Sequence, residues 1–137
     1  IRELNNSLSA FATTLKGLGV WDNVVTYTAS DFNRTFTPNA SQGSDHAWGG
    51  HAIVMGGAVN GGNIYGHYPT LKTGAVSTPV DVDAGRGRWI PSTSVDQYSA
   101  VMAKWMGVQS TAMDAIFPNL YRFDDPFTVS TSNLAFL

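Results

Sequence analysis

The chain of 137 residues contains no cysteine and few charged residues, and these absences exclude several classes of protein. Without cysteine there is no disulfide framework and no thiolate metal site. Charged residues make up 13% of the chain and the formal net charge is -2, so no basic face is available to bind the phosphates of a nucleic acid. No apolar run approaches the roughly 20 residues that span a bilayer. We therefore expect no nucleic-acid partner and no membrane span.

The spacing of apolar residues predicts three helices. The first runs from residue 4 to residue 18 and ends at Gly19, because its apolar residues are three or four positions apart. The second begins with a capping box at residues 94–97 and ends near Gly107, and the third covers residues 111–117. The apolar face of the first helix comprises Leu4, Leu8, Phe11, Leu15 and Leu18.

Two segments between the first and second helices have the composition of strands. Residues 24–29 are β-branched and aromatic without alternation, which is typical of a strand covered on both faces. A second strand is predicted at residues 51–59, and Asn60-Gly61 predicts a hairpin that returns through residues 63–66. Helices that alternate with buried strands indicate an α/β fold with a mixed sheet.

Two stretches have no regular pattern. Residues 69–91 are rich in Gly, Pro, Thr and Asp and form a long connection of the kind that carries function or covers a site. Residues 126–137 are predicted to be an irregular tail after a domain at residues 1–125.

The chain opens with Ile1 inside a predicted helix, so we expect it to be a processed or partial chain.

Candidate metal ligands are concentrated in the stretch SDHAWGGH at residues 44–51, with Asp31 upstream. His46 and His51 lie five residues apart next to glycines, so they do not fit the HExxH zinc helix. Asp31, Asp45, His46 and His51 could ligate zinc or manganese from loops and strand ends. The alternative is a histidine that holds a loop through hydrogen bonds.

Arginines supply candidate anion binders. Arg34 follows the predicted strand, and Arg86 and Arg88 lie in the segment GRGRW at residues 85–89. A guanidinium pairs bidentately with phosphate or carboxylate, so these arginines could clamp an anion. A solvated loop or a structural ion pair is the alternative for Arg86 and Arg88. No nucleotide-binding glycine motif and no GxSxG nucleophile elbow is present.

The order of these motifs resembles the C-terminal part of a large bacterial family, catalogued as domain of unknown function number fifteen-oh-one, in the alkaline phosphatase and sulfatase superfamily. The resemblance covers about residues 1–123. It implies an alkaline-phosphatase-like fold, with a mixed and mostly parallel sheet between helices, and export to the periplasm or beyond. The matching segments are SDFNRT, GSDHAWGGH, GGAVNGGNIYG, GRGRWIPSTSVDQY and FPNL.

The resemblance also implies a function and its residues. Asp31 falls on the first metal-binding aspartate of the superfamily pattern and His46 on its downstream histidine, whereas Phe32 occupies the position of a metal-binding histidine. The resemblance implies that the chain is a fragment of a phosphate or sulfate ester hydrolase that uses zinc, manganese or calcium. Asp45 is a further metal residue, Arg34 and His51 are the candidate catalytic residues, and Asp45 or His51 could orient the His46 imidazole.

The isolated chain is expected to be inactive, because the nucleophile and the other ligands would lie in a missing N-terminal portion. That portion, or another copy of the chain, is the expected partner. The alternative is a non-catalytic binding or assembly module that keeps the superfamily scaffold. Phe32 favours this alternative, since phenylalanine cannot ligate a metal.

Overall fold

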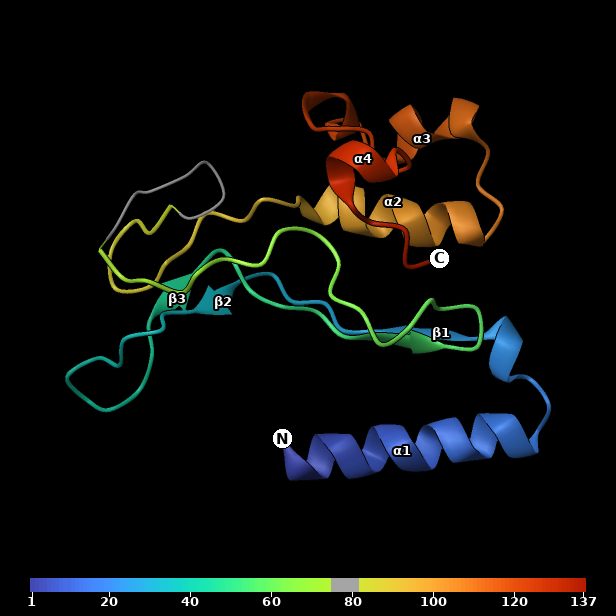
Figure 1. The fold of residues 1–137 in the computed structure, drawn as a ribbon, viewed down its shortest axis with the longest axis horizontal. Helices are drawn as coiled ribbons and strands as arrows, with labels where there is room; N and C mark the ends of the chain where they lie inside the picture. The colour runs from blue at the N-terminus through green and yellow to red at the C-terminus, as the bar shows by residue number, and fades with distance from the viewer. Residues whose placement is uncertain (75–81) are drawn as a thin grey trace. The chain divides into compact units, whose positions relative to one another are not determined.

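The structure is a computed structural model that describes residues 1–74 and 82–137 (Figure 1). Residues 75–81, which belong to the predicted irregular connection, lie outside the described residues. The chain divides into two units, Ile1–Ala29 with Ala52–Gly62 and Ser30–His51 with Asn63–Leu137. Both units contain helices and short strands, so the chain is a mixed α/β protein.

The helices and strands with their bounds are α1 (Arg2–Gly17), η1 (Trp21–Asn23), β1 (Val25–Tyr27), β2 (Asn33–Arg34), β3 (His46–Ala47), β4 (Val54–Gly56), α2 (Val95–Trp105), α3 (Ser110–Ile116), η2 (Leu120–Arg122) and α4 (Val129–Ser132).

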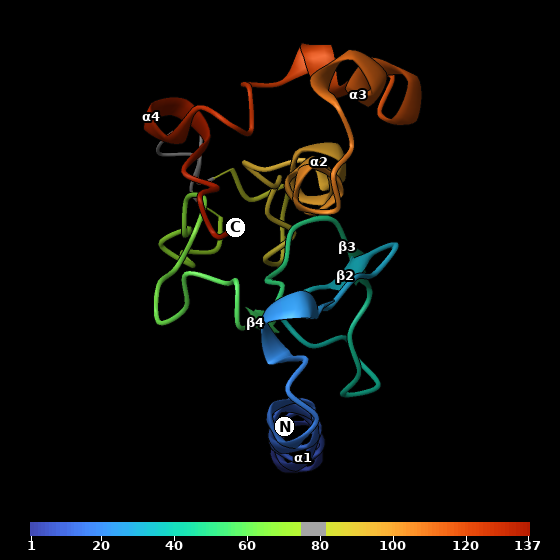
Figure 2. The same cartoon turned by 90° about the vertical axis from the view of Figure 1, so that its right-hand side faces the viewer.

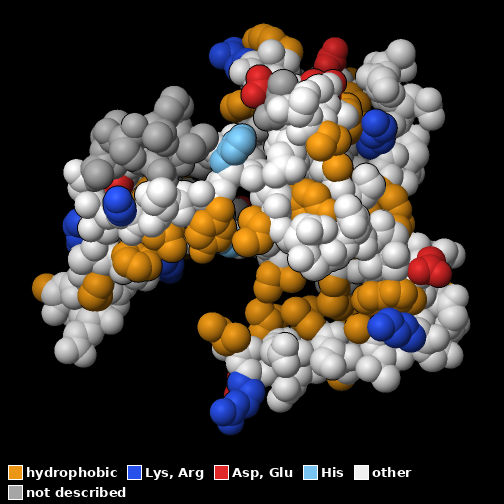
Figure 3. All heavy atoms as spheres, in the orientation of Figure 1, with side chains coloured by type: hydrophobic (Ala, Val, Ile, Leu, Met, Phe, Trp, Pro, Cys, Tyr) orange, Lys and Arg blue, Asp and Glu red, His pale blue; other side chains and the backbone are white. Residues whose placement is uncertain are grey.

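The first unit consists of α1, the short helix η1 and the antiparallel pair β1–β4. The predicted helix is confirmed, and it ends where Gly19 adopts a φ of 70°. Leu15 packs inside, whereas Leu4 and Phe11 remain about half exposed on the same face. Figure 2 looks along the axis of α1, and Figure 3 shows hydrophobic side chains gathered along one side of this helix.

The hairpin predicted at Asn60-Gly61 is wrong. β4 pairs instead with β1, with Thr26 opposite Met55. Residues 63–66 form no strand, because the amide of Gly66 donates to the carbonyl of Asn133 at 2.9 Å and its carbonyl accepts from the Asn133 Nδ2 at 3.3 Å. At Gly66 the backbone is therefore bonded to the C-terminal segment of the same unit.

The second unit holds the pair β2–β3 and the helices α2, α3, η2 and α4. Both sheets formed by the described residues are antiparallel. The predicted capping box is confirmed at the start of α2, where the Gln97 amide donates to Ser94 Oγ and the Ser94 amide donates to Gln97 Oε1. No helix among the described residues is both long enough and apolar enough to cross a membrane.

The hydrophobic core of the second unit lies between α2, α3 and η2. Ala100, Met113 and Leu120 are its buried members, and side chains such as Phe117 and Phe127 pack against them. The segment predicted as an irregular tail contains α4 and contributes buried apolar side chains at positions 134 and 136. The C-terminal residues are thus packed into the second unit.

Candidate functional site

The pair β2–β3 determines which of the candidate residues meet. Arg34 lies directly opposite His46 in the antiparallel register. The pairing extends by one position, because the Thr35 amide donates to the Asp45 carbonyl at 3.0 Å and the Asp45 amide donates to Thr35 Oγ1 at 3.1 Å. A guanidinium and an imidazole that are twelve residues apart in sequence are therefore neighbours across the sheet.

Phe32 lies between these two side chains on the exposed face of the pair. Its ring centroid is 4.2 Å from that of His46, and the Arg34 Cζ lies 4.9 Å from the Phe32 ring. Arg34 Nη1 also donates to the carbonyl of Ser44 at 3.2 Å. The other guanidinium N–H groups of Arg34 make no hydrogen bond to the described residues, so this cation is held in place and exposed to solvent.

Asp31 lies at the turn just before this face. Ser30 Oγ donates to the Phe32 carbonyl at 2.7 Å and closes the turn around the aspartate. The Asp31 carboxylate is exposed and makes no ion pair with the described residues. Its role as a metal ligand, like that of His46, remains a prediction.

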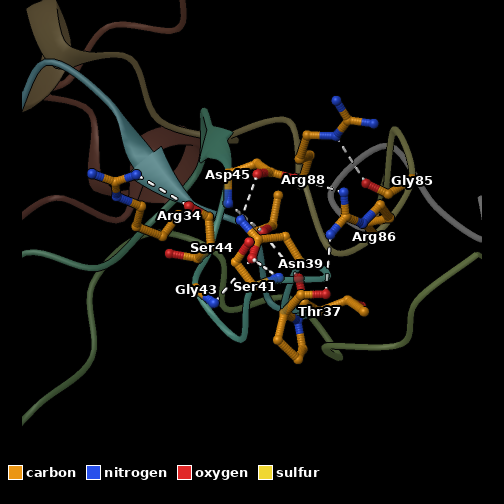
Figure 4. A network of polar contacts seen from close by, with 12 residues as sticks. Arg34, Thr37, Asn39, Ser41, Gly43, Ser44, Asp45, Gly85, Arg86 and Arg88 are labelled. Atoms are coloured by element: carbon orange, nitrogen blue, oxygen red, sulfur yellow. Dashed lines mark hydrogen bonds and ion pairs between the residues drawn. The ribbon is translucent and has the colours of Figure 1, made fainter.

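Asp45 has both carboxylate oxygens engaged by protein groups (Figure 4). Asn39 Nδ2 donates to Oδ1 at 2.9 Å, and Arg86 Nη1 donates to Oδ2 at 2.6 Å in an ion pair. The hydrogen bond from Asn39 and that from Arg86 hold the pKa of Asp45 below its ordinary value of 3.8. The Asp45 carboxylate is therefore ionised at neutral pH, and the positive charge of the Arg86 guanidinium balances it.

The loop between β2 and β3 is closed by Asn39. Its Oδ1 accepts hydrogen bonds from the amides of Ser41 at 3.1 Å and Gly43 at 2.9 Å. Arg86 Nη2 reaches the same loop at the Pro38 carbonyl, 3.0 Å away. An asparagine that bonds to amides two and four residues ahead is typical of a tight polar turn, and this local pattern could have identified Asn39 from the sequence.

The turn that carries Arg86 is organised by Asp83, which sequence analysis missed. Asp83 is buried, and it accepts backbone hydrogen bonds from Gly85 at 2.8 Å and Arg88 at 3.0 Å on Oδ1 and from Gly74 at 2.8 Å on Oδ2. Burial by itself would raise the pKa of Asp83, but backbone amides outweigh it and lower the pKa from the ordinary 3.8. An aspartate shortly before a Gly-Arg-Gly turn was the available signal.

The remaining predicted site residues have separate partners. His51 stacks on Tyr68, with ring centroids 4.7 Å apart and planes at 25°. The ring of His46 packs instead against Phe32. Arg88 Nε donates to the Gly85 carbonyl at 3.0 Å, while Arg86 pairs with Asp45. Arg86 thus forms a structural ion pair, one of the alternatives predicted for these arginines, and Arg88 bonds to a backbone carbonyl of its own turn.

The donor set at residues 31–51 does not make a complete metal site. Among the residues that the structure describes, no group of three or more His, Asp or Glu side chains could hold a metal ion. Each carboxylate oxygen of Asp45 already accepts one hydrogen bond from a protein side chain, and Asp31, His46 and His51 are the other candidate donors. A tetrahedral site needs about four ligands, so others would have to come from outside the described residues.

Comparisons with known proteins support only the family. No curated protein and no solved structure matches the chain. The sequence model of the family described as protein of unknown function (DUF1501) matches residues 1–109, which is most of the chain. The chain therefore belongs to the DUF1501 family.

Proposed function

We propose that this chain is the part of an exported, metal-dependent phosphate or sulfate ester hydrolase that binds the ester anion. The observation that supports it is the register of β2–β3, which sets Arg34 opposite His46. The resemblance of the motifs to the alkaline phosphatase and sulfatase superfamily supplies the reaction class. In this proposal the short antiparallel pairs belong to a larger, mostly parallel sheet, and the protein works in the periplasm or outside the cell.

Arg34 is the anion-binding residue in this proposal. The Phe32 ring and the Ser44 carbonyl hold its guanidinium, and the remaining N–H groups face solvent. A guanidinium in this state can donate two parallel hydrogen bonds to a phosphate or sulfate. The anion would be bound on the exposed face, next to His46.

His46 and Asp31 would contribute two donors to a cation such as zinc, manganese or calcium, with further ligands from another part of the full-length protein. A bound cation supplies charge neutralisation for the ester. His51 is the candidate proton carrier, since its imidazole is exposed and is oriented by its stack on Tyr68. The nucleophile would also come from outside residues 1–137.

The test is hydrolysis of p-nitrophenyl phosphate and p-nitrophenyl sulfate by the full-length protein with zinc, manganese or calcium. Arg34→Met should raise KM, because it removes anion binding, and His46→Ala should lower kcat together with bound metal. His67→Ala is the matched control, since His67 is exposed in the same unit and makes no side-chain hydrogen bond to the described residues. Equal loss in His46→Ala and His67→Ala would contradict the proposal.

A second candidate, a non-catalytic binding or assembly module, is supported by the packing of Phe32 against His46. The second unit also exposes Trp48, Ile64 and Met106, each by 60% or more of its surface. Trp and Met side chains are enriched in protein interfaces, and the partner would be the N-terminal portion of the parent chain or another copy. Under this candidate, His46→Ala lowers stability without any ester turnover to lose, and gel filtration of the full-length protein shows an assembly.

A further inference from the structure

We propose that Asp45 and Arg86 form a clasp that positions Arg34 and His46, and that Asp45 is not a ligand of the cation. The clasp itself follows from the contacts of the two loops. Its effect on cation binding rests on the proposed function. The sequence pattern predicts Asp45 to be a metal residue, so this assignment changes the role of one of the predicted ligands.

The clasp joins two loops that are far apart in sequence. Arg86 lies 41 residues after Asp45, and its two terminal nitrogens reach Asp45 Oδ2 and the Pro38 carbonyl. Asp45 is the last residue of the loop between β2 and β3, and Pro38 lies four residues after the end of β2. One guanidinium therefore ties two points of this loop to the turn at residues 83–89.

The backbone around Arg86 is held in an uncommon conformation for this contact. Arg86 has a φ of 63°, and Gly85 and Gly87 on either side have φ values of 102° and 71°. A non-glycine residue in the left-handed region is uncommon, because its Cβ lies close to the following carbonyl oxygen. The hydrogen bonds from this turn to the buried Asp83 stabilise the conformation, and the Phe36 and Thr37 amides bond to the Gly87 and Arg86 carbonyls.

The clasp acts on the candidate site through the backbone. Asp45 bonds to Thr35 and is followed directly by His46, while the carbonyl of Ser44 holds the Arg34 guanidinium. Successive side chains of an extended strand point to opposite faces, so the Asp45 carboxylate points away from the His46 imidazole. Asp45 thus fixes the strand that carries His46 but does not share its face.

A double-mutant cycle tests this assignment in the full-length protein. Asp45→Asn keeps an acceptor for Asn39 but removes the ion pair, and Arg86→Gln removes its cation. Each single variant should speed amide exchange at Thr35 and Gly43 by roughly two- to fivefold, the range expected for an exposed ion pair. The double variant should exchange no faster than the single ones, because both changes break the same contact. Arg122→Gln, in η2, is the matched control and should change nothing.

Zinc affinity, measured by calorimetry on the same four proteins, separates a positioning residue from a ligand. If Asp45 only positions His46, Asp45→Asn weakens zinc binding in the wild-type background but not further in the Arg86→Gln background. Additive exchange rates would overturn the clasp. A further loss of zinc affinity when Asp45→Asn is added to Arg86→Gln would show that Asp45 is a ligand and would overturn its assignment. Wild-type protein that binds no zinc would refute the cation part of the proposed function and the effect on cation binding, while the exchange data would still decide the clasp.

Discussion

Asp83 offers the sharpest test of how the second unit is held together. The residue is 7% exposed, and its carboxylate accepts three backbone hydrogen bonds, from Gly74, Gly85 and Arg88. Asp83→Ala removes the acceptor from all three amides at once. A hydrogen bond to a charged group contributes a net stabilisation of about 1.5–3 kcal/mol. The three donor residues are partly or fully exposed, so water can bond to their freed amides and recover part of this energy. We therefore expect Asp83→Ala to lower the free energy of unfolding by about 3 kcal/mol.

Urea unfolding followed by tryptophan fluorescence measures this loss, and Trp89 is well placed as a probe because it forms a β-bridge with Asp83. Asp124→Ala serves as the control, since that side chain is exposed and makes no hydrogen bond to the described residues. The reasoning would be refuted by a loss below about 1 kcal/mol in Asp83→Ala, which is within the range of one ordinary hydrogen bond.

The pKa of Asp83 is lower in the folded protein than its ordinary 3.8. The stability that ionised Asp83 contributes is therefore fully present above pH 3.8 and is lost as the pH falls through the folded-state pKa. When the free energy of unfolding is measured at decreasing pH, Asp83→Ala should lose less stability than the wild type. Gln97→Ala removes the capping-box partner of Ser94 and a 2.7 Å hydrogen bond to the Asp124 carbonyl, so urea unfolding should show a loss of about 2 kcal/mol. Gly87→Ala, at a φ of 71°, places a Cβ against that of Phe36, and exchange of the Phe36 amide should become faster while α2 keeps its protection.

Local patterns in the sequence were enough to predict the longer helices, although the short α4 was missed. The spacing from Leu4 to Leu18 and the capping box at Ser94 each act within a few residues, and both helices form where they were expected. Strand pairing was not predictable in this way. The Asn60-Gly61 turn favoured a local hairpin, but β4 pairs with β1 about thirty residues earlier, because pairing is decided by long-range contacts.

The candidate site was predictable in its residues but not in their contacts. Sequence motifs identified Arg34 and His46, and the structure brings them together across β2–β3. The motifs gave no indication that Arg86 would reach Asp45, because an ion pair between residues 41 positions apart depends on how two loops fold. Asp83 was missed because a lone aspartate in an irregular stretch has no periodic pattern, although it organises that turn.

The central claim is that His46 belongs to a cation site beside the anion-binding Arg34. The most direct measurement is the metal content of the full-length protein, purified as wild type, His46→Ala and His67→Ala, after equal exposure to zinc, manganese and calcium. The account predicts a stoichiometric cation in the wild type and in His67→Ala and its loss from folded His46→Ala. A folded His46→Ala variant that keeps the wild-type metal content, or a wild type that binds no cation, would contradict it.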